Sequence, residues 1–357
     1  MDKNNFQFSI IFLTLLLVSC QSYRYIEIET FNPAVITFPP EIRTVMIVNN
    51  SAQQPDHIGH KYLELLDMSD VDSVLNVSVD SMAYRFCLFL GQAIAESPLF
   101  DDVRICEDTL RHDSLFYMSQ PFSVQTVEAL CDMYDVDALI TLDKLYYRTA
   151  FYNYYANTMR MITAEIIGEM RMVYPGFQMA YVIPFVDTLI LSTDEYYYMV
   201  NETFTIQDIQ DAILVLTEHT AQKMQNNFAP YWTDDKRWYY TNVSSGWKRA
   251  SVFAAAEKWE AAANEWRHLL TITSKWKQKA MLASNLALFH EIQGDFTRAI
   301  EYATLANTLF MEHTGEEDRL NVMQNKYLEL LQKREEDDKT LSEQLGENSN
   351  VQFSPQD

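Results

Sequence analysis

The stretch that decides the fold is residues 138–191, ALITLDKLYYRTAFYNYYANTMRMITAEIIGEMRMVYPGFQMAYVIPFVDTLIL. It contains three long segments rich in β-branched, aromatic and other apolar residues, at 138–155, 159–174 and 179–191. Such a composition is typical of β-strands, and strands that follow one another after short turns pair as antiparallel hairpins. The separating pairs Ala156-Asn157 and Pro175-Gly176 are of the turn-forming kind. The run therefore predicts a long antiparallel sheet.

The residues before this run predict parallel strands with helical crossovers. The apolar stretch 43–50 is expected to be a buried strand, and 77–97 has apolar residues three and four apart, which indicates a helix that ends at Pro98. A short strand over 102–106 and a helix over 124–134 lead into the long run, and a last helix is expected over 206–227. The prediction is an α+β or α/β domain over residues 41–243, a mixed β-sheet with helices packed on it.

Three motifs in this domain resemble a known α/β architecture. They are RTVMIVNNS at 43–51, LGQAIAESPLFDDVRI at 90–105 and VDALITLDKL at 136–145. Their order is similar to the domain shared by the amino-terminal part of TolB, the secretion lipoprotein CsgG and outer-membrane activators of penicillin-binding proteins. With the runs FAPYW at 228–232 and RWYY at 237–240, the chain resembles an uncharacterised lipoprotein family of Bacteroidota. The resemblance implies an architecture and a location, and no activity.

Residues 246–335 are expected to form a small all-α domain of helical repeats. The segment from Asn285 to Ala306 resembles a tetratricopeptide repeat, with small Ala287 and Ala299 allowing two helices to approach and Gly294-Asp295 making the turn. A degenerate copy lies upstream around Trp259, and a final helix over 318–334 is expected to cap the stack.

The two ends of the chain predict an anchor and a tail. An apolar run at residues 10–18 followed by Ser19-Cys20 resembles a bacterial lipoprotein signal, which implies a signal peptide over 1–19 and a lipid on Cys20. Residues 20–40 are expected to be a tether. Residues 336–357 are polar and acidic, so we expect a disordered tail there. The expected location is the outer membrane, lipid-anchored and facing the periplasm.

Charge and cysteine content limit the partners. The 357 residues carry a net charge of -23, nearly all of it before residue 236, and such a surface repels nucleic acid. The body is expected to meet the membrane through the N-terminal lipid only. If Cys20 is lipidated, Cys87, Cys106 and Cys131 remain, of which two at most can form a disulfide. We interpret them as small buried residues of the core.

No motif predicts catalysis. GxSxG, Walker, HExxH, CxxC and GxGxxG patterns do not occur, and no cofactor or metal is expected. His57 and His60 have the spacing of half a metal site, but no further ligands accompany them in the sequence. We therefore expect a protein that is not an enzyme, although catalytic acids from separate segments would leave no trace in one sequence.

Two surfaces are the candidate binding sites. Tyrosines gather around the first hairpin, and Tyr196-Tyr197-Tyr198 follow the last strand; such rings either cover a sheet face or form a recognition surface. The second candidate is the groove lined by the first helices of the repeats. The expected contact residues are Tyr147, Tyr152, Tyr154, Lys279, Asn285 and Phe289. The predicted function is a non-catalytic interaction or assembly module for an envelope protein, and the alternative is a glycan-binding lipoprotein of a polysaccharide-processing system.

Overall fold

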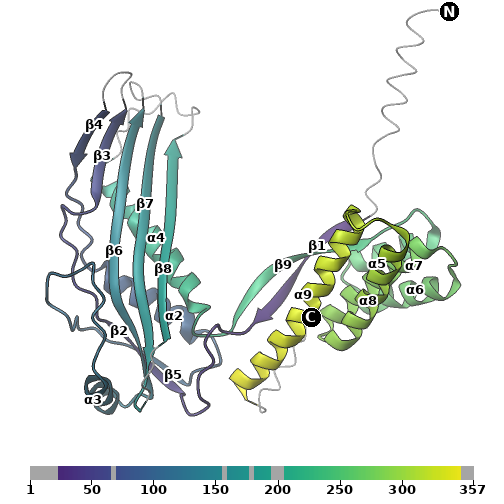
Figure 1. The fold of residues 1–357 in the computed structure, drawn as a ribbon, viewed down its shortest axis with the longest axis horizontal. Helices are drawn as coiled ribbons and strands as arrows, with labels where there is room; N and C mark the ends of the chain where they lie inside the picture. The colour runs from purple at the N-terminus through teal and green to yellow at the C-terminus, as the bar shows by residue number, and fades with distance from the viewer. Residues whose placement is uncertain (1–22, 66–69, 155–158, 177–180, 194–204, 347–357) are drawn as a thin grey trace, which may run out of the picture. The chain divides into compact units, whose positions relative to one another are not determined.

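A computed structural model describes residues 23–65, 70–154, 159–176, 181–193 and 205–346. These residues form two compact units (Figure 1), which we call the sheet unit, residues 33–231 with 341–346, and the helical unit, residues 23–32 with 232–340. The fold class is mixed: a multi-stranded sheet with helices on it, followed by an all-helical region. Cys20 and Tyr196-Tyr197-Tyr198 lie outside the described residues.

The sheet unit is built on one seven-stranded sheet in which parallel and antiparallel pairs meet on the long strand β6. Its strands are β2 (Thr44–Asn49), β3 (His60–Leu65), β4 (Asp70–Val74), β5 (Asp102–Ile105), β6 (Ala138–Tyr154), β7 (Met159–Val173) and β8 (Tyr181–Thr193). On one side β6 pairs antiparallel with β7, which pairs with β8, as the hairpin turns predict. On its other side β6 pairs in parallel with β2 near its start and with β3 near its end.

The strands β3 and β4 were not predicted from the sequence. Residues 50–59 carry the chain along the edge of β6 from β2 to β3, and one side chain fills the gap between them. The Gln54 amide accepts from the N–H of Tyr147 at 2.7 Å and donates to its carbonyl oxygen at 2.9 Å. Gln54 thus takes the place of one residue of a neighbouring strand.

Helices cover one face of the sheet along most of its length (Figure 1). These helices are α2 (Met82–Ala95) and α4 (Ile206–Gln225), and α3 (Val124–Tyr134) packs on the opposite face near the start of β6. In α2 the buried residues Phe86, Cys87, Leu90 and Ile94 recur at helical spacing, as predicted. The Phe86 ring stacks on that of Phe185 of β8, with 5.3 Å between the ring centroids. Phe185 in turn lies over Gly168, where the Cβ atom of any other residue would stand 2.1 Å from the ring.

The helical unit consists of five helices and a two-stranded ribbon. The helices are α5 (Ser245–Ala255), α6 (Trp259–Ile272), α7 (Trp276–Ile292), α8 (Phe296–His313) and α9 (Arg319–Leu345), and the ribbon pairs β1 (Tyr23–Asn32) with β9 (Tyr231–Tyr240). Gly294, with φ +72°, forms the turn between α7 and α8, and Asp295 caps α8 by accepting from the N–H of Arg298. Ala287 and Ala299, the small residues that were predicted to let two helices approach, belong to the same cluster of buried residues.

Three boundaries differ from the sequence prediction. The predicted tether, residues 20–40, contains β1, and the residues after it pack on the sheet unit, where Val35 donates to the carbonyl of Asn226. The predicted tail from residue 336 begins with ten helical residues of α9, because Leu341 and Gln344 are buried in the sheet unit. The first domain ends at residue 231 rather than 243, since most of β9 belongs to the helical unit.

The three remaining cysteines are buried and free. Burial raises the pKa of Cys87 to about 12 and that of Cys131 to about 11. Because the thiolate is the reactive form, Cys87 and Cys131 are expected to be protonated and unreactive at neutral pH. Over the described ranges no helix has the length and apolar character that crossing a bilayer requires.

Candidate interaction surfaces

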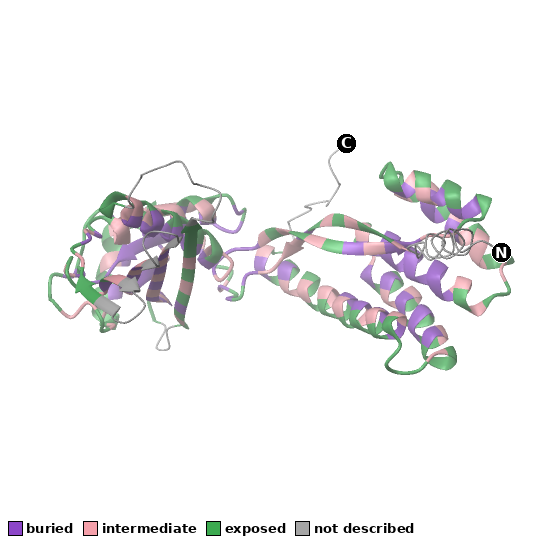
Figure 2. Cartoon of the chain, turned by 90° about the horizontal axis from the view of Figure 1, so that it is seen from above, coloured by how far each residue is buried: buried purple, intermediate pink, exposed green. Residues whose placement is uncertain are grey.

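The groove of the helical unit is filled by the chain's own strand β9. Helix α7 is buried along twelve consecutive residues, Ala280–Glu291, so no face of this stretch is open to solvent (Figure 2). An amphipathic helix with a free groove face would show a polar, exposed stripe. The ribbon therefore covers the face of α7 that was predicted to bind a partner.

Asn285 of α7 holds the edge of this strand. Its amide accepts from the N–H of Tyr240 at 2.6 Å and donates to the carbonyl oxygen of Tyr240 at 2.9 Å. Both residues are fully buried. The main chain of β9 therefore pairs with β1 along one edge and, at Tyr240, with Asn285 on the other.

The side chains of β9 wedge between helices on both of its faces. Tyr239 lies 6.2 Å from Trp266 of α6, whereas Tyr240 lies 6.3 Å from Phe310 of α8 and Trp238 lies 5.2 Å from Tyr327 of α9, all measured between ring centroids. Aromatic pairs at these separations add to the free energy that burial supplies. The strand is thus part of the core of the helical unit.

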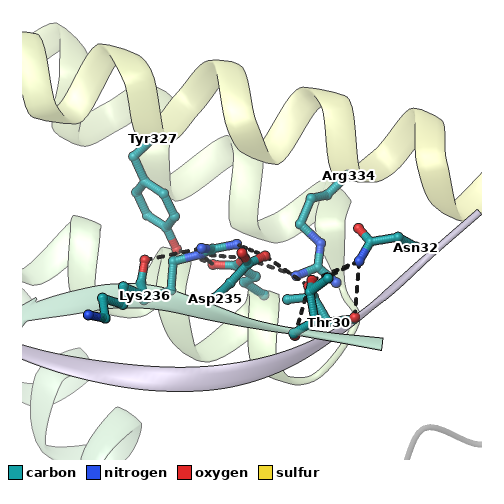
Figure 3. Close-up of polar contacts among 9 residues, drawn as sticks. Thr30, Asn32, Asp235, Lys236, Tyr327 and Arg334 are labelled. Atoms are coloured by element: carbon teal, nitrogen blue, oxygen red, sulfur yellow. Dashed lines mark hydrogen bonds and ion pairs between the residues drawn. The ribbon is translucent and has the colours of Figure 1, made fainter. Parts of the chain in front are cut away.

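A buried charge cluster closes the groove beside this strand. Arg237 of β9 donates to Glu291 of α7 at 2.9 Å and 3.2 Å, the Tyr327 hydroxyl donates to the same carboxylate at 2.8 Å, and Arg334 of α9 lies 3.3 Å from it. Figure 3 shows the aromatic and basic side chains descending from α9 onto the ribbon, where Asp235 lies. Asp235 adds a second acid, 3.4 Å from Arg237.

The pKa directions in this cluster follow from burial and pairing. Burial alone would lower the pKa of Arg237, but the Glu291 carboxylate outweighs it and raises the pKa. Burial also raises the pKa of Tyr327 well above its ordinary value, and the adjacent Glu291 adds to this. For Arg334 burial prevails and lowers the pKa. Both arginines are paired with carboxylates, so the cluster holds α7, α9 and β9 together.

The ribbon carries its own polar contacts across the two strands. Thr30 of β1 bonds to Asp235 and to the hydroxyl of Thr233, each at 2.8 Å, and the Asn32 amide donates to Thr233 at 2.9 Å (Figure 3). These bonds tie β1 to the strand that the helices hold. This site was not predicted from the sequence, although an acid at Glu291 beside the mainly apolar run 280–289 was a signal of a buried ion pair.

The predicted groove contacts are therefore corrected. Asn285 and Phe289 are buried beneath β9 or between helices and are not available to a partner, and Lys279 is half-buried in α7. The prediction was wrong because no strand was predicted over 231–240, where the charged residues Asp234-Asp235-Lys236 interrupt the apolar pattern.

The predicted tyrosine surface divides between the two faces of the sheet. Tyr147 points into the core, where its hydroxyl lies 2.8 Å from that of Thr217 and burial raises its pKa, so the prediction of a surface ring is wrong for this residue. Tyr152 lies on the opposite face and is half-buried. Tyr154 belongs to β6, but its side chain lies outside the described residues.

Beyond α3, no described element covers that opposite face, and we call it the open face. Over residues 144–152 of β6, 161–173 of β7 and 182–190 of β8 burial alternates residue by residue, so one side of the strands faces α2 and α4 and the other side is more exposed. The open face consists of Arg148, Ala150, Tyr152, Met161, Thr163, Glu165, Ile167, Val182, Val186, Thr188 and Ile190. Val186 and Ile190 are 60% and 61% exposed, with Ile167 and Thr163 beside them in the register.

A second polar cluster lies on this side of the sheet, under the loop that precedes α3. Asp143, fully buried at an irregularity of β6, bonds to Arg171 at 2.6 Å and accepts from the Asn50 amide at 2.8 Å. Burial raises the pKa of Asp143. Arg171 also pairs with Glu169, which accepts from the Ser119 hydroxyl at 2.6 Å. With both acids paired, the cluster pins the loop to the sheet.

The sheet unit contains a small cavity and the two histidines that have the spacing of half a metal site. At the end of β2, a cavity of about 30 Å³ is lined by Asn49, Ser51 and Gln54 among others, which is room for about one water molecule. His60 is buried with Nδ1 2.8 Å from the Thr149 hydroxyl, and His57 is exposed, so the two do not converge. Nowhere in the described part of the chain do three His, Cys, Asp or Glu side chains gather as a metal site would require.

Comparisons with known proteins give two family matches. Residues 42–240 match the family described as domain of unknown function DUF8603, and residues 248–333 match domain of unknown function DUF6340. No curated protein matches.

Two solved structures resemble parts of the chain distantly. A minor lipoprotein from Acinetobacter baumannii is 8% identical, with a TM-score of 0.24 over 52% of this chain and 90% of its own. An uncharacterised protein is 11% identical, with a TM-score of 0.22 over 53% of this chain and 97% of its own. At these TM-scores neither structure informs the function of this chain.

Proposed function

We propose that this chain, which belongs to the DUF8603 family of domains of unknown function, is a lipid-anchored envelope protein that docks a protein partner on the open face of its sheet unit. The role is that of a non-catalytic interaction or assembly module. The anchor is the lipid on Cys20, and the expected place is the periplasmic side of the outer membrane.

The anchor rests on the sequence alone. A short apolar run followed by Ser19-Cys20 has the form of a lipoprotein signal. Attached acyl chains bury enough methylene groups for stable attachment when more than one chain is present.

The single observation that carries the docking surface is the exposed aliphatic stripe on β8. Val182, Val186 and Ile190 recur every four residues on one side of an edge strand, and each is at least 45% exposed. Large apolar side chains that gather on an uncovered face are typical of protein interaction sites. An ion pair between Arg148 and Glu165 beside them supplies the polar part of such a surface.

The composition of the face favours a protein over a glycan. A sugar is usually held by an exposed aromatic ring with polar groups around it. On the open face the most exposed large side chains are aliphatic, and Tyr152 is half-buried. The buried acids Asp143 and Glu291 are each paired with an arginine.

The test compares partner recovery by two matched variants of the full-length protein. Val186→Glu places a charge on the open face, and Val215→Glu places the same charge on an exposed position of α4, away from that face. Both positions are exposed, so we expect both variants to fold. Envelope proteins that co-purify with the wild type and with Val215→Glu, and are lost with Val186→Glu, are the expected result. Equal recovery by both variants would contradict the docking surface.

Lipidation is tested separately. A labelled fatty acid supplied to cells is expected in the wild-type protein and absent from Cys20→Ala, which should also leave the membrane fraction. A labelled Cys20→Ala protein would contradict the anchor.

A further inference from the structure

The first described strand, β1, begins only three residues after Cys20. Strand β1 begins at Tyr23 and pairs with β9, which the helices hold through Asn285 and Arg237. Three residues span at most about 10 Å when fully extended. A lipid on Cys20 therefore brings the end of the helical unit where β1 starts against the bilayer surface.

That end of the helical unit is rich in aromatic side chains. The Tyr23 ring lies 5.4 Å from Tyr25 and 6.4 Å from Tyr240, and Tyr240 lies 6.3 Å from Phe310. Trp276, the first residue of α7, is 6.3 Å from Phe310. These contacts gather the start of β1, the end of β9, the start of α7 and the end of α8 in one place.

Exposed apolar side chains lie on the segments next to this aromatic group. Tyr25 is 59% exposed, Val243 just after β9 is 74% exposed, and Ile272 at the end of α6 is 64% exposed. Ile272 belongs to the same end, because Leu269 three residues earlier lies against Gly246 at the start of α5. Exposed apolar side chains next to tyrosine and tryptophan are typical of surfaces that lie at the interface of a bilayer.

The charges at this end are mixed. Arg24, Lys275, Lys277 and Arg319 are exposed, with Arg319 donating to the Tyr23 hydroxyl at 2.8 Å, and the loop 316–318 before α9 supplies three exposed acids. Long basic side chains can extend to lipid phosphates while their stems cover apolar surface. Because the acids offset them, contact with lipid is expected to depend on the apolar side chains more than on lipid charge.

We propose that this end of the helical unit, around Tyr23, Tyr25, Val243 and Ile272, is a membrane-contact surface that lies on the phospholipid headgroups. The proposal rests on the proposed lipidation of Cys20. From the sequence, contact with the membrane was expected through the N-terminal lipid only. This surface adds a second, non-covalent contact.

The test measures how close each end of α7 comes to lipid. The full-length lipidated protein is prepared as Lys277→Cys or Gln293→Cys, labelled with a fluorescent maleimide, and reconstituted into phosphatidylcholine vesicles that contain a spin-labelled quencher lipid. Both positions are exposed, and they stand about 24 Å apart along one helix. The native thiols are buried and react little. Quenching several-fold stronger at position 277 than at 293 is the expected result, and equal quenching would overturn the proposal.

A second variant separates contact from mere proximity. Tyr25→Ser, Val243→Ser and Ile272→Ser combined are expected to abolish most of the quenching at position 277 while the protein still sediments with vesicles. Unchanged quenching in this variant would overturn the role of these side chains. If mass spectrometry finds no lipid on Cys20, the anchor itself fails, and this surface fails with it.

Discussion

The amide of Asn285 bonds to both the N–H and the carbonyl oxygen of Tyr240, at 2.6 and 2.9 Å, and so acts as a neighbouring strand for β9. The same arrangement occurs twice in the sheet unit, where Gln54 bonds to Tyr147 and Gln344 bonds to Ala34, each through both main-chain atoms. Three side-chain amides thus complete the hydrogen bonding of buried main-chain groups, which would be costly to leave unpaired.

Asn285→Ala is expected to destabilise the helical unit by about 2–3 kcal/mol, because it leaves two buried main-chain groups of Tyr240 unpaired. All six tryptophans lie between residues 232 and 276, so denaturant unfolding followed by tryptophan fluorescence reports this unit alone. Asn264→Ala, at an exposed position of α6, is the control and should change the free energy of unfolding by less than about 0.5 kcal/mol. Equal losses in both variants would show that the hydrogen bonds between Asn285 and Tyr240 contribute nothing.

Glu291→Gln is expected to cost the same unit about 3 kcal/mol, since it leaves Arg237 and Arg334 buried without their shared carboxylate. Tryptophan fluorescence again supplies the measurement. Glu301→Gln on the exposed side of α8 is the matched control and should be nearly neutral. A neutral Glu291→Gln would mean that water or Asp235 compensates the two arginines.

Gln54→Ala is expected to weaken β6 locally, by about 2 kcal/mol, because the N–H and carbonyl of Tyr147 lose their partner between β2 and β3. Hydrogen–deuterium exchange should become faster in the peptide that contains Tyr147. The neighbouring Gln53 is exposed and bonds to Asp80 rather than to Tyr147, so Gln53→Ala should leave exchange in that peptide as in the wild type. Protection that persists in Gln54→Ala would refute the account.

His60 is expected to make the sheet unit sensitive to acid. Burial lowers the pKa of His60 to about 4, and nearby Asp56 only partly opposes this. Below an ordinary histidine pKa of about 6.5 the unfolded chain binds a proton that the folded chain does not, so stability falls as pH drops from about 6.5 to 4. The loss is at most about 3 kcal/mol and levels off below pH 4.

The check on this pH dependence is the difference between variants. His60→Asn removes the titrating group, so exchange protection in β3 and β6 should fall less steeply over pH 6.5–4 than in the wild type. His57→Gln changes an exposed histidine of the same loop and should keep the wild-type slope. Identical slopes in all three proteins would exclude His60 as the source.

Local patterns in the sequence predicted most of the sheet unit and the helices. Apolar spacing in 77–97 and alternation in 138–191 have the same period as the elements they form, so α2, β6, β7 and β8 follow from neighbouring residues. The crossover order before β6 likewise predicted the parallel pairs of β2 with β5 and β6.

The ribbon could not be predicted in the same way, because its strands are about two hundred residues apart. The segment 26–29, Ile-Glu-Ile-Glu, alternates like a strand and was a usable signal, but nothing nearby identifies β9 as its partner. Without β9, the groove over Asn285 was predicted to be free. The faces of the tyrosines were equally hidden, since adjacent Tyr146 and Tyr147 differ only in which side of β6 they point to.

The most direct test of the central claim is photo-cross-linking in living cells from single positions of the full-length protein. A photoreactive amino acid at Ile190, on the open face, is expected to give a discrete adduct with a second protein, and the same amino acid at Val215 on α4 is expected to give none. No adduct from position 190, or the same adduct from both positions, would contradict a partner on the open face.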